Sequence, residues 1–414
     1  MFQNSTDIIK NLINSLVENM ELPGINILVR QNGRDLFYHQ SGYRDVNKKL
    51  PLERDSILHM YSMTKPITGF AATLLLERGV ISLGDAVDKY IPAFGDIRVW
   101  NKDTGAITKR SRPVYIKDLY CMTSGLSYPA DDASYPPGVA SAALYRQVDE
   151  GLKGGPAVTT LEFAERTAKN GILAFEPGSG WLYGTSADIM GAIIEIATGV
   201  PFSKFLLKEV FEPLEMPDTA FFCPKEKLDR LAPAYRFGEW LFNPFVPRQA
   251  LFTGECEWKE LDFNHLGIFR KGTKEPFFIS GGAGLLSTIE DYSHFADMLL
   301  NHGTYKGKRL LSPLMCDFFT SGGLMPWQQE SMWHTWDSMG GYDYNGFMRI
   351  GTGSAMGHQL QLKGEYGWDG WLGTYFANLP TFNATLLLGV QLQDAGALTY
   401  MQRIRNAVLS LFNQ

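Results

Sequence analysis

Closely spaced cysteines and histidines are missing from this sequence. Its 414 residues include four cysteines, far apart at positions 121, 223, 256 and 316, and no Cys-x-x-Cys pair. The seven histidines form no His-Glu-x-x-His pattern. Disulfide frameworks and zinc sites normally show such paired ligands. We therefore expect reduced cysteines, no metal and no cofactor.

An excess of positive charge is also missing. The chain has 38 Lys and Arg residues against 44 Asp and Glu residues, so its net charge is −6, and its basic residues are scattered. Nucleic acids and anionic membrane surfaces are bound by clustered basic side chains. The composition therefore predicts a small-molecule partner, with no nucleic acid and no membrane. It does not predict an oligomeric state.

Long hydrophobic runs are absent as well. No apolar segment approaches the roughly 20 residues that span a bilayer. The first 22 residues lack the basic start and apolar core of a signal peptide, and Asp7 interrupts them. They predict an amphipathic helix whose apolar face holds Ile8, Ile9, Leu12, Ile13, Leu16 and Val17. We expect a cytoplasmic protein.

Strand patterns lie near both ends of the chain. In residues 25–42 two apolar runs flank Asn32-Gly33, which is a strong hairpin signal. Residues 373–392 give two further strand-like runs around a proline, and residues 397–412 give an amphipathic helix. The two ends of the chain are therefore predicted to build one sheet together.

The middle of the chain has a different pattern. It is rich in Pro, Gly and Tyr, with helical patterns at 160–171 and 187–199. We predict an α/β protein of the α+β type, in which an antiparallel sheet is flanked by helices. Residues 1–94 and 276–414 would form this sheet domain, and residues 95–275 a mostly helical insertion. The cleft between them is the expected site.

Ser62 and Lys65 are the first candidates for chemistry. They stand three residues apart where a helix should begin, since Pro66 is tolerated only in a first turn. Both side chains would share one face, and a buried lysine loses its charge readily enough to take a serine's proton. The alternative is a capping serine with a solvated lysine. No Gly-x-Ser-x-Gly elbow offers another nucleophile.

Tyr183 is the third candidate. It stands between a Pro-Gly turn and a predicted helix in "FEPGSGWLYGTSADIMGAIIEIATG", residues 175–199. A tyrosine beside a lysine ammonium can have a depressed pKa and shuttle protons. The alternative is an ordinary packing tyrosine.

Several segments in order resemble the serine β-lactamase-like superfamily, in particular its class C β-lactamase and family VIII carboxylesterase branch. They are "SMTK", "DLYCMTSGLSYP" (118–129), residues 175–199 and "ISGGAGLLSTIEDYSHFADMLLN" (279–301). The resemblance covers about residues 20–395. It implies that Ser62 is the acylated nucleophile, Lys65 its base partner and Tyr183 the proton shuttle.

The sequence departs from that family at two motifs. Thr185 stands where the family's Tyr-x-Asn motif has asparagine, and what it does there is left open. Trp368-Asp369-Gly370 stands where β-lactamases have Lys-Thr-Gly, as in the Trp-Gly-Gly of family VIII esterases. Trp368 would line the cleft, although a core position is the alternative. Asp369 would repel anions if it faces the cleft. Gly370 would let the backbone approach the substrate closely, and the N–H of Trp371 would join that of Ser62 in holding an oxyanion.

These features favour a serine hydrolase that cleaves carboxylic esters of small neutral substrates through an acyl-enzyme. A β-lactamase or a D-amino-acid peptidase or amidase of the same superfamily is the alternative. A non-catalytic binding member is a further one. The acyl and alcohol preferences are not predicted, nor are the conformations of segments 130–157 and 323–345, which read as loops that shape the cleft.

Overall fold

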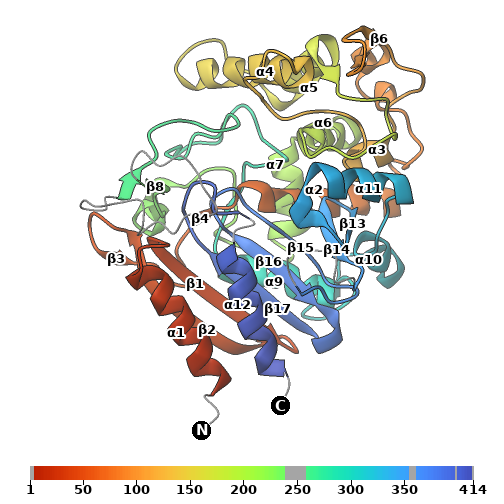
Figure 1. Ribbon diagram of the computed structural model, residues 1–414. Helices are drawn as coiled ribbons and strands as arrows, with labels where there is room; N and C mark the ends of the chain where they lie inside the picture. The colour runs from red at the N-terminus through yellow and green to blue at the C-terminus, as the bar shows by residue number, and fades with distance from the viewer. Residues whose placement is uncertain (1–3, 238–257, 354–359, 397–398, 413–414) are drawn as a thin grey trace.

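Eight antiparallel strands form the main sheet of the computed structural model, which describes residues 4–237, 258–353, 360–396 and 399–412. The strand order is β13-β14-β15-β16-β17-β1-β2-β3. Their bounds are β1 Gly24–Gln31, β2 Arg34–Asp45, β3 Leu50–Pro51, β13 Tyr342–Asn345, β14 Met348–Gly351, β15 Tyr366–Asp369, β16 Tyr375–Leu379 and β17 Ala384–Gly389. The two ends of the chain meet where β1 pairs with β17, as the red and blue strands of Figure 1 show. The predicted fold class is confirmed.

The predicted hairpin lies at the start of this sheet. β1 and β2 are joined by Asn32 and Gly33, which have φ angles of 53° and 70°. These left-handed angles are those of a two-residue hairpin turn, and they explain the Asn-Gly pair. The predicted turn between β16 and β17 is also present, at Pro380.

Two terminal helices cover one face of the sheet. They are α1, Ser5–Glu18, and α12, Thr399–Leu409, which lie side by side in Figure 1. Their buried apolar residues pack in one cluster with alternate residues of β17, including Leu386 and Leu388. The face predicted for the first helix is right except at Ile8, which is 39 % exposed because it turns away from the sheet. Positions 397 and 398 of the predicted last helix lie outside the described residues.

The opposite face of the sheet packs against α2, Thr64–Glu77, and α9, Ile289–Leu300. Leu387 of β17 points to this side, where the rings of Phe70 and Phe295 meet at 5.6 Å. The sheet is thus buried on both faces. This second cluster holds α2, and with it the start of the helix that carries Lys65.

The middle of the chain contains most of the remaining helices, at the top of Figure 1. They are α3 Ile116–Tyr120, α4 Pro136–Leu152, α5 Thr160–Asn170, α6 Ser186–Thr198 and α7 Phe202–Leu206. Short strands accompany them at β5 Arg98–Trp100, β6 Ile107–Lys109, β7 Ile172–Leu173, β8 Tyr235–Phe237 and β9 Trp258–Glu260. The conformation of 130–157 was not predicted beyond its being rich in loops, and α4 occupies most of the segment. The domain boundaries at 95 and 275 stay predictions.

The other described elements connect these layers. They are β4 Leu58–His59, β10 Leu286–Ser287, β11 Thr304–Tyr305, β12 Lys308–Arg309, α10 Pro313–Phe319 and α11 Pro326–Thr335. Segment 323–345, whose conformation was not predicted, contains α11 and ends in β13. Within the described ranges, no single helix is long and apolar enough to cross a membrane. One pair of helices, bent by 81°, passes that test only when both are counted together.

Candidate active site

Ser62 and Lys65 meet at the start of α2. Ser62 lies in a tight turn, Tyr61–Met63, that runs directly into the helix. The Lys65 Nζ lies 3.1 Å from the Ser62 Oγ, within hydrogen-bond reach. Both side chains are buried, as the spacing of three residues predicts for one face of a helix. The alternative of a solvated lysine is wrong for this protein.

The Lys65 ammonium is enclosed by oxygen atoms. Besides Ser62, its Nζ donates to the Tyr128 hydroxyl at 2.7 Å and to the Gly282 carbonyl at 2.8 Å. Burial lowers the pKa of Lys65 to about 7, although the negative charges of Asp188 and Asp369 oppose the shift. An amine with that pKa is partly neutral near pH 7, so it can accept a proton from Ser62.

Tyr183 lies beside this pair, just before α6. Its ring centre is 4.7 Å from the Lys65 Nζ, and its hydroxyl accepts a hydrogen bond from the Trp368 indole at 3.0 Å. Burial raises the pKa of Tyr183, and hydrogen bonds from Ser62 and Trp368 only partly offset it. The expected depressed pKa of Tyr183 is therefore wrong, because burial outweighs the two hydrogen bonds and the charges of Asp369 and Asp188 add to the rise. The protonated phenol is the form that the site favours.

Tyr128 is a site residue that the sequence analysis missed. It comes from the segment after α3, and its ring contacts that of Tyr183 with centroids 5.4 Å apart. Its hydroxyl forms the shortest of the three hydrogen bonds made by the Lys65 amine. The available signal was its place in "DLYCMTSGLSYP", a segment that resembled the superfamily without pointing to this tyrosine.

Trp368 and Asp369 end strand β15 at the site. Trp368 is 1 % exposed, and its ring packs tilted against Tyr183 and perpendicular to Trp336, with centroids 5.4 and 6.0 Å away. Asp369 also reaches the cavity, but its carboxylate is paired with the buried Arg349. The expectation that Asp369 adds an uncompensated negative charge is therefore corrected.

Gly370 and Trp371 directly follow Asp369 in the sequence. A Cβ on Gly370 would lie 2.4 Å from the Met60 carbonyl oxygen, so packing against Met60 requires glycine there. The close approach of this backbone to a substrate stays a prediction. The Trp371 indole stacks on His265 at 3.9 Å and packs edge-on against Tyr61 at 5.0 Å. Thr185 begins α6 and lines a separate small cavity, and no hydrogen bond joins it to Lys65 within the described residues.

A cavity of about 810 Å³ contains the Ser62 side chain. Four aromatic side chains form much of its wall: Tyr183, Trp336, Trp368 and Trp371. Helix α4 contributes polar side chains from Arg146 and Asp149 on the same cavity. The space is large enough for both halves of a modest ester, with apolar groups against the aromatic wall.

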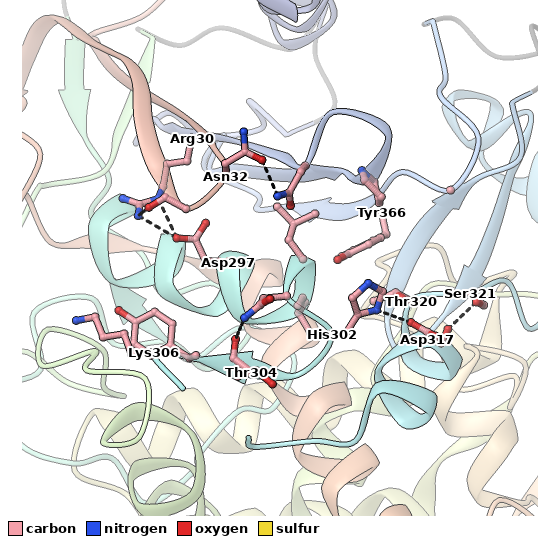
Figure 2. A pocket seen from close by; sticks show the side chains of 18 residues that line it. Arg30, Asn32, Asp297, His302, Thr304, Lys306, Asp317, Thr320, Ser321 and Tyr366 are labelled. Carbon is pink, nitrogen blue, oxygen red and sulfur yellow. Dashed lines mark hydrogen bonds and ion pairs between the residues drawn. The ribbon is translucent and has the colours of Figure 1, made fainter. Parts of the chain in front are cut away.

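A larger cavity, of about 1040 Å³, lies elsewhere (Figure 2). It lies between the β1–β2 turn, the end of α9 and the β16–β17 turn, and it contains none of the predicted site residues. Several of its polar side chains bond to one another, such as Arg30 to Asp297 and His302 to Asp317. The larger volume therefore does not mark the place where Ser62, Lys65 and Tyr183 meet.

The fold and this geometry agree with comparisons to known proteins. A family model described as beta-lactamase matches residues 9–398. The chain belongs to the beta-lactamase family. The predicted resemblance is thereby confirmed, and an enzyme of the serine hydrolase class is supported.

The relatives of this beta-lactamase family member have low sequence identity, but the matches cover most of the chain. Protein Rv1367c of Mycobacterium tuberculosis is 27 % identical over 376 residues, which cover 89 % of this chain and 86 % of that protein. Esterase EstB of Burkholderia gladioli is 27 % identical over 275 residues, covering 65 % and 64 %. The solved structure of EstCE1, a hydrolase with promiscuous acyltransferase activity, superposes with a TM-score of 0.74 at 21 % identity and covers 98 % of both chains.

Proposed function

We propose that this protein cleaves carboxylic esters of small neutral substrates through an acyl-enzyme on Ser62. The observation that carries the proposal is the buried Lys65 amine, 3.1 Å from the Ser62 hydroxyl and with a pKa near 7. A base tuned to neutral pH beside a serine at a cavity wall is the arrangement of nucleophilic catalysis.

The reaction would take two steps. The Ser62 Oγ attacks the ester carbonyl while its proton passes to Lys65, and the carbonyl oxygen becomes an oxyanion held by the N–H groups of Ser62 and Trp371. The intermediate then collapses, the C–O bond to the alcohol breaks, and the alcohol leaves with a proton supplied through Tyr183. Water attacks the acyl-enzyme by the same path in reverse, which releases the acid and restores Ser62.

The cavity wall at Trp368, where β-lactamases have a lysine, favours the proposal of neutral substrates. An indole at Trp368 cannot form the charge-assisted hydrogen bond that a lysine gives to a substrate carboxylate. Arg349 lies nearby, but it is committed to Asp369. A relative of the same family is named as an esterase. A β-lactamase or D-peptidase activity remains the second candidate, since it shares the acylation step.

Paired substrates test this proposal. Losing a charge-assisted hydrogen bond is worth about 1.5–3 kcal/mol, or roughly ten- to a hundred-fold in rate. We expect kcat/KM for p-nitrophenyl butyrate to exceed that for the carboxylate-bearing β-lactam nitrocefin by at least that factor. Trp368→Lys should narrow the gap, and Trp368→Phe, which restores no cation, should not. Equal turnover of both substrates by the wild-type protein would favour the second candidate instead.

A further inference from the structure

Arg270 is a buried cation behind the nucleophile. It is 9 % exposed, and its polar contacts within the described residues include no carboxylate. Its guanidinium instead donates to three neutral oxygens. One arm reaches the Tyr61 hydroxyl at 3.2 Å, and the other reaches the carbonyls of Leu261 and Phe263. A buried guanidinium is costly unless its donors are satisfied, so these partners fix the side chain firmly.

Tyr61 directly precedes Ser62, and its backbone is unusual. Its φ angle is 44°, in the left-handed region that bulky residues rarely adopt. Such a conformation persists only where surrounding contacts hold it. The Tyr61 ring is 1 % exposed and is held by Arg270 at its hydroxyl. The position of the Ser62 N–H therefore depends on contacts made by the Tyr61 side chain.

The same ring also contacts the other side of the proposed oxyanion site. It packs edge-on against Trp371, with centroids 5.0 Å apart, and against His265 at 5.9 Å. His265 stacks on Trp371 in turn, and both line the cavity with Ser62. The Tyr61 side chain thus packs on Trp371, and the Tyr61 backbone is bonded directly to Ser62. These two neighbours are the residues whose N–H groups would hold the oxyanion.

The geometry points to Arg270 as a positioning residue that acts through Tyr61. By holding the Tyr61 hydroxyl and the 261–270 segment together, it sets the relative placement of the Ser62 and Trp371 backbones. This rests on the proposed function, because it assigns a purpose to those two N–H groups. Its effect is expected on the transition state, where the oxyanion exists, and not on ground-state binding.

Two substitutions separate this role from a merely structural one. Tyr61→Phe keeps the ring and removes the hydroxyl, and Arg270→Met removes the cation. Since loss of one oxyanion donor costs ~10²–10³ in kcat, displacement of the pair should lower kcat for p-nitrophenyl butyrate by about ten-fold or more. KM should stay within about two-fold. Binding of a butyl boronic acid, which forms a tetrahedral adduct on serine, should weaken by the same factor as kcat falls.

Three further variants complete the test: the double variant, a conservative variant of Arg270 and a control at another arginine. The double variant should be no worse than the poorer single one, because both remove one interaction, and Arg270→Lys should recover part of kcat. Arg44 is the control: it also donates to two carbonyls, of Pro51 and Asp229 at 2.9 Å each, and pairs with Glu53 at 3.4 Å, but its polar contacts do not include Tyr61. Arg44→Met should lower the melting temperature and leave kcat unchanged.

Each outcome decides a separate point. An unchanged kcat in Tyr61→Phe, measured well below its melting temperature, overturns the positioning role even if Arg270→Met fails to fold. Equal losses of kcat in Arg44→Met and Arg270→Met also overturn it, because the effect would then be general destabilisation. A wild-type protein with no esterase activity would instead refute the proposed function on which the role rests.

Discussion

At the residue scale, one lysine decides what this site can do. Lys65 is completely enclosed, and its hydrogen bonds to Ser62, Tyr128 and Gly282 hold the amine in place. The spacing of Ser62 and Lys65 was predictable, because it is a property of one helical turn. Tyr128 and Gly282 were not, since they come from positions 63 and 217 residues away along the chain.

The pH dependence of activity follows from this enclosure. Below pH 7 the Lys65 amine is protonated and cannot take the Ser62 proton, and above it the amine is free. We expect kcat/KM for p-nitrophenyl butyrate to rise with pH from 5 to 8, with a midpoint near 7. A profile that rises only above pH 9 would show that burial does not lower the pKa of Lys65.

Lys65 and Tyr183 should act as one proton-transfer unit. General acid–base groups contribute about 10²–10⁴-fold, so Lys65→Ala and Tyr183→Phe should each lower kcat by at least that range. Because the proton path needs both groups, the double variant should be little worse than either single one. Fully additive losses in a double-mutant cycle would mean that the two act independently.

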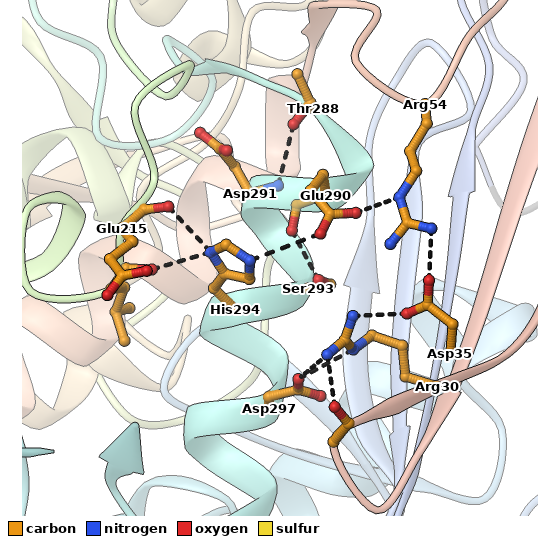
Figure 3. A network of polar contacts seen from close by, with 12 residues as sticks. Arg30, Asp35, Arg54, Glu215, Thr288, Glu290, Asp291, Ser293, His294 and Asp297 are labelled. Atoms are coloured by element: carbon orange, nitrogen blue, oxygen red, sulfur yellow. Dashed lines mark hydrogen bonds and ion pairs between the residues drawn. The ribbon is translucent and has the colours of Figure 1, made fainter. Parts of the chain in front are cut away.

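At the scale of elements, ion pairs connect α9 to the β1–β2 hairpin, including one between Arg30 and Asp297 (Figure 3). Arg54 contacts both Asp35 and Glu290, and His294 lies on the next turn of α9 from Glu290, with its Nε2 3.7 Å away. Burial opposes the charged imidazole, but Glu290 and the Glu215 carbonyl raise the pKa of His294 overall. His294 in turn helps lower the pKa of Glu290 to about 2.

His294→Gln tests what the His294–Glu290 pair contributes to stability, through its pH dependence. A raised histidine pKa gives stability that is complete below pH 6.5 and is lost as pH rises through the folded-state value. Because the pair is partly exposed, we expect a loss of only about 0.5–1 kcal/mol at pH 5.5 and less at pH 8.5. Thermal or urea unfolding at both pH values measures it. His302→Gln, at an exposed pair with Asp317, is the control, and an equal loss from both variants would contradict the account.

A buried ion pair joins α12 to the residue that precedes β15. Arg405 of α12 is paired with Glu365, and both side chains are almost fully buried. Glu365 also accepts hydrogen bonds from the Tyr342 hydroxyl and the Leu362 N–H. Glu365→Ala would leave the guanidinium buried without its partner, so we expect a loss of about 3–5 kcal/mol in unfolding free energy. Glu365→Met with Arg405→Met should recover most of it. A loss under about 1 kcal/mol in Glu365→Ala would show that the pair is hydrated.

At the scale of the whole molecule, the sheet drawn from both chain ends was predictable and much of the cavity wall was not. Hairpin and strand patterns are local, so the Asn32-Gly33 turn and the strands around Pro380 could be predicted from short windows. Helix α4 was missed because Pro136 and Pro137 suggest a loop, although prolines suit a first helical turn. The pairing of Asp369 with Arg349 joins two strands and leaves no local signal.

Covalent labelling shows whether Ser62 forms the proposed acyl-enzyme. The protein would be treated with a fluorophosphonate probe and, separately, mixed rapidly with p-nitrophenyl butyrate. Intact mass spectrometry and peptide mapping would then locate any adduct. We expect one phosphonyl or butyryl group on Ser62, and neither labelling nor turnover in Ser62→Ala. An adduct on another residue, or labelling and turnover that persist in Ser62→Ala, would contradict it.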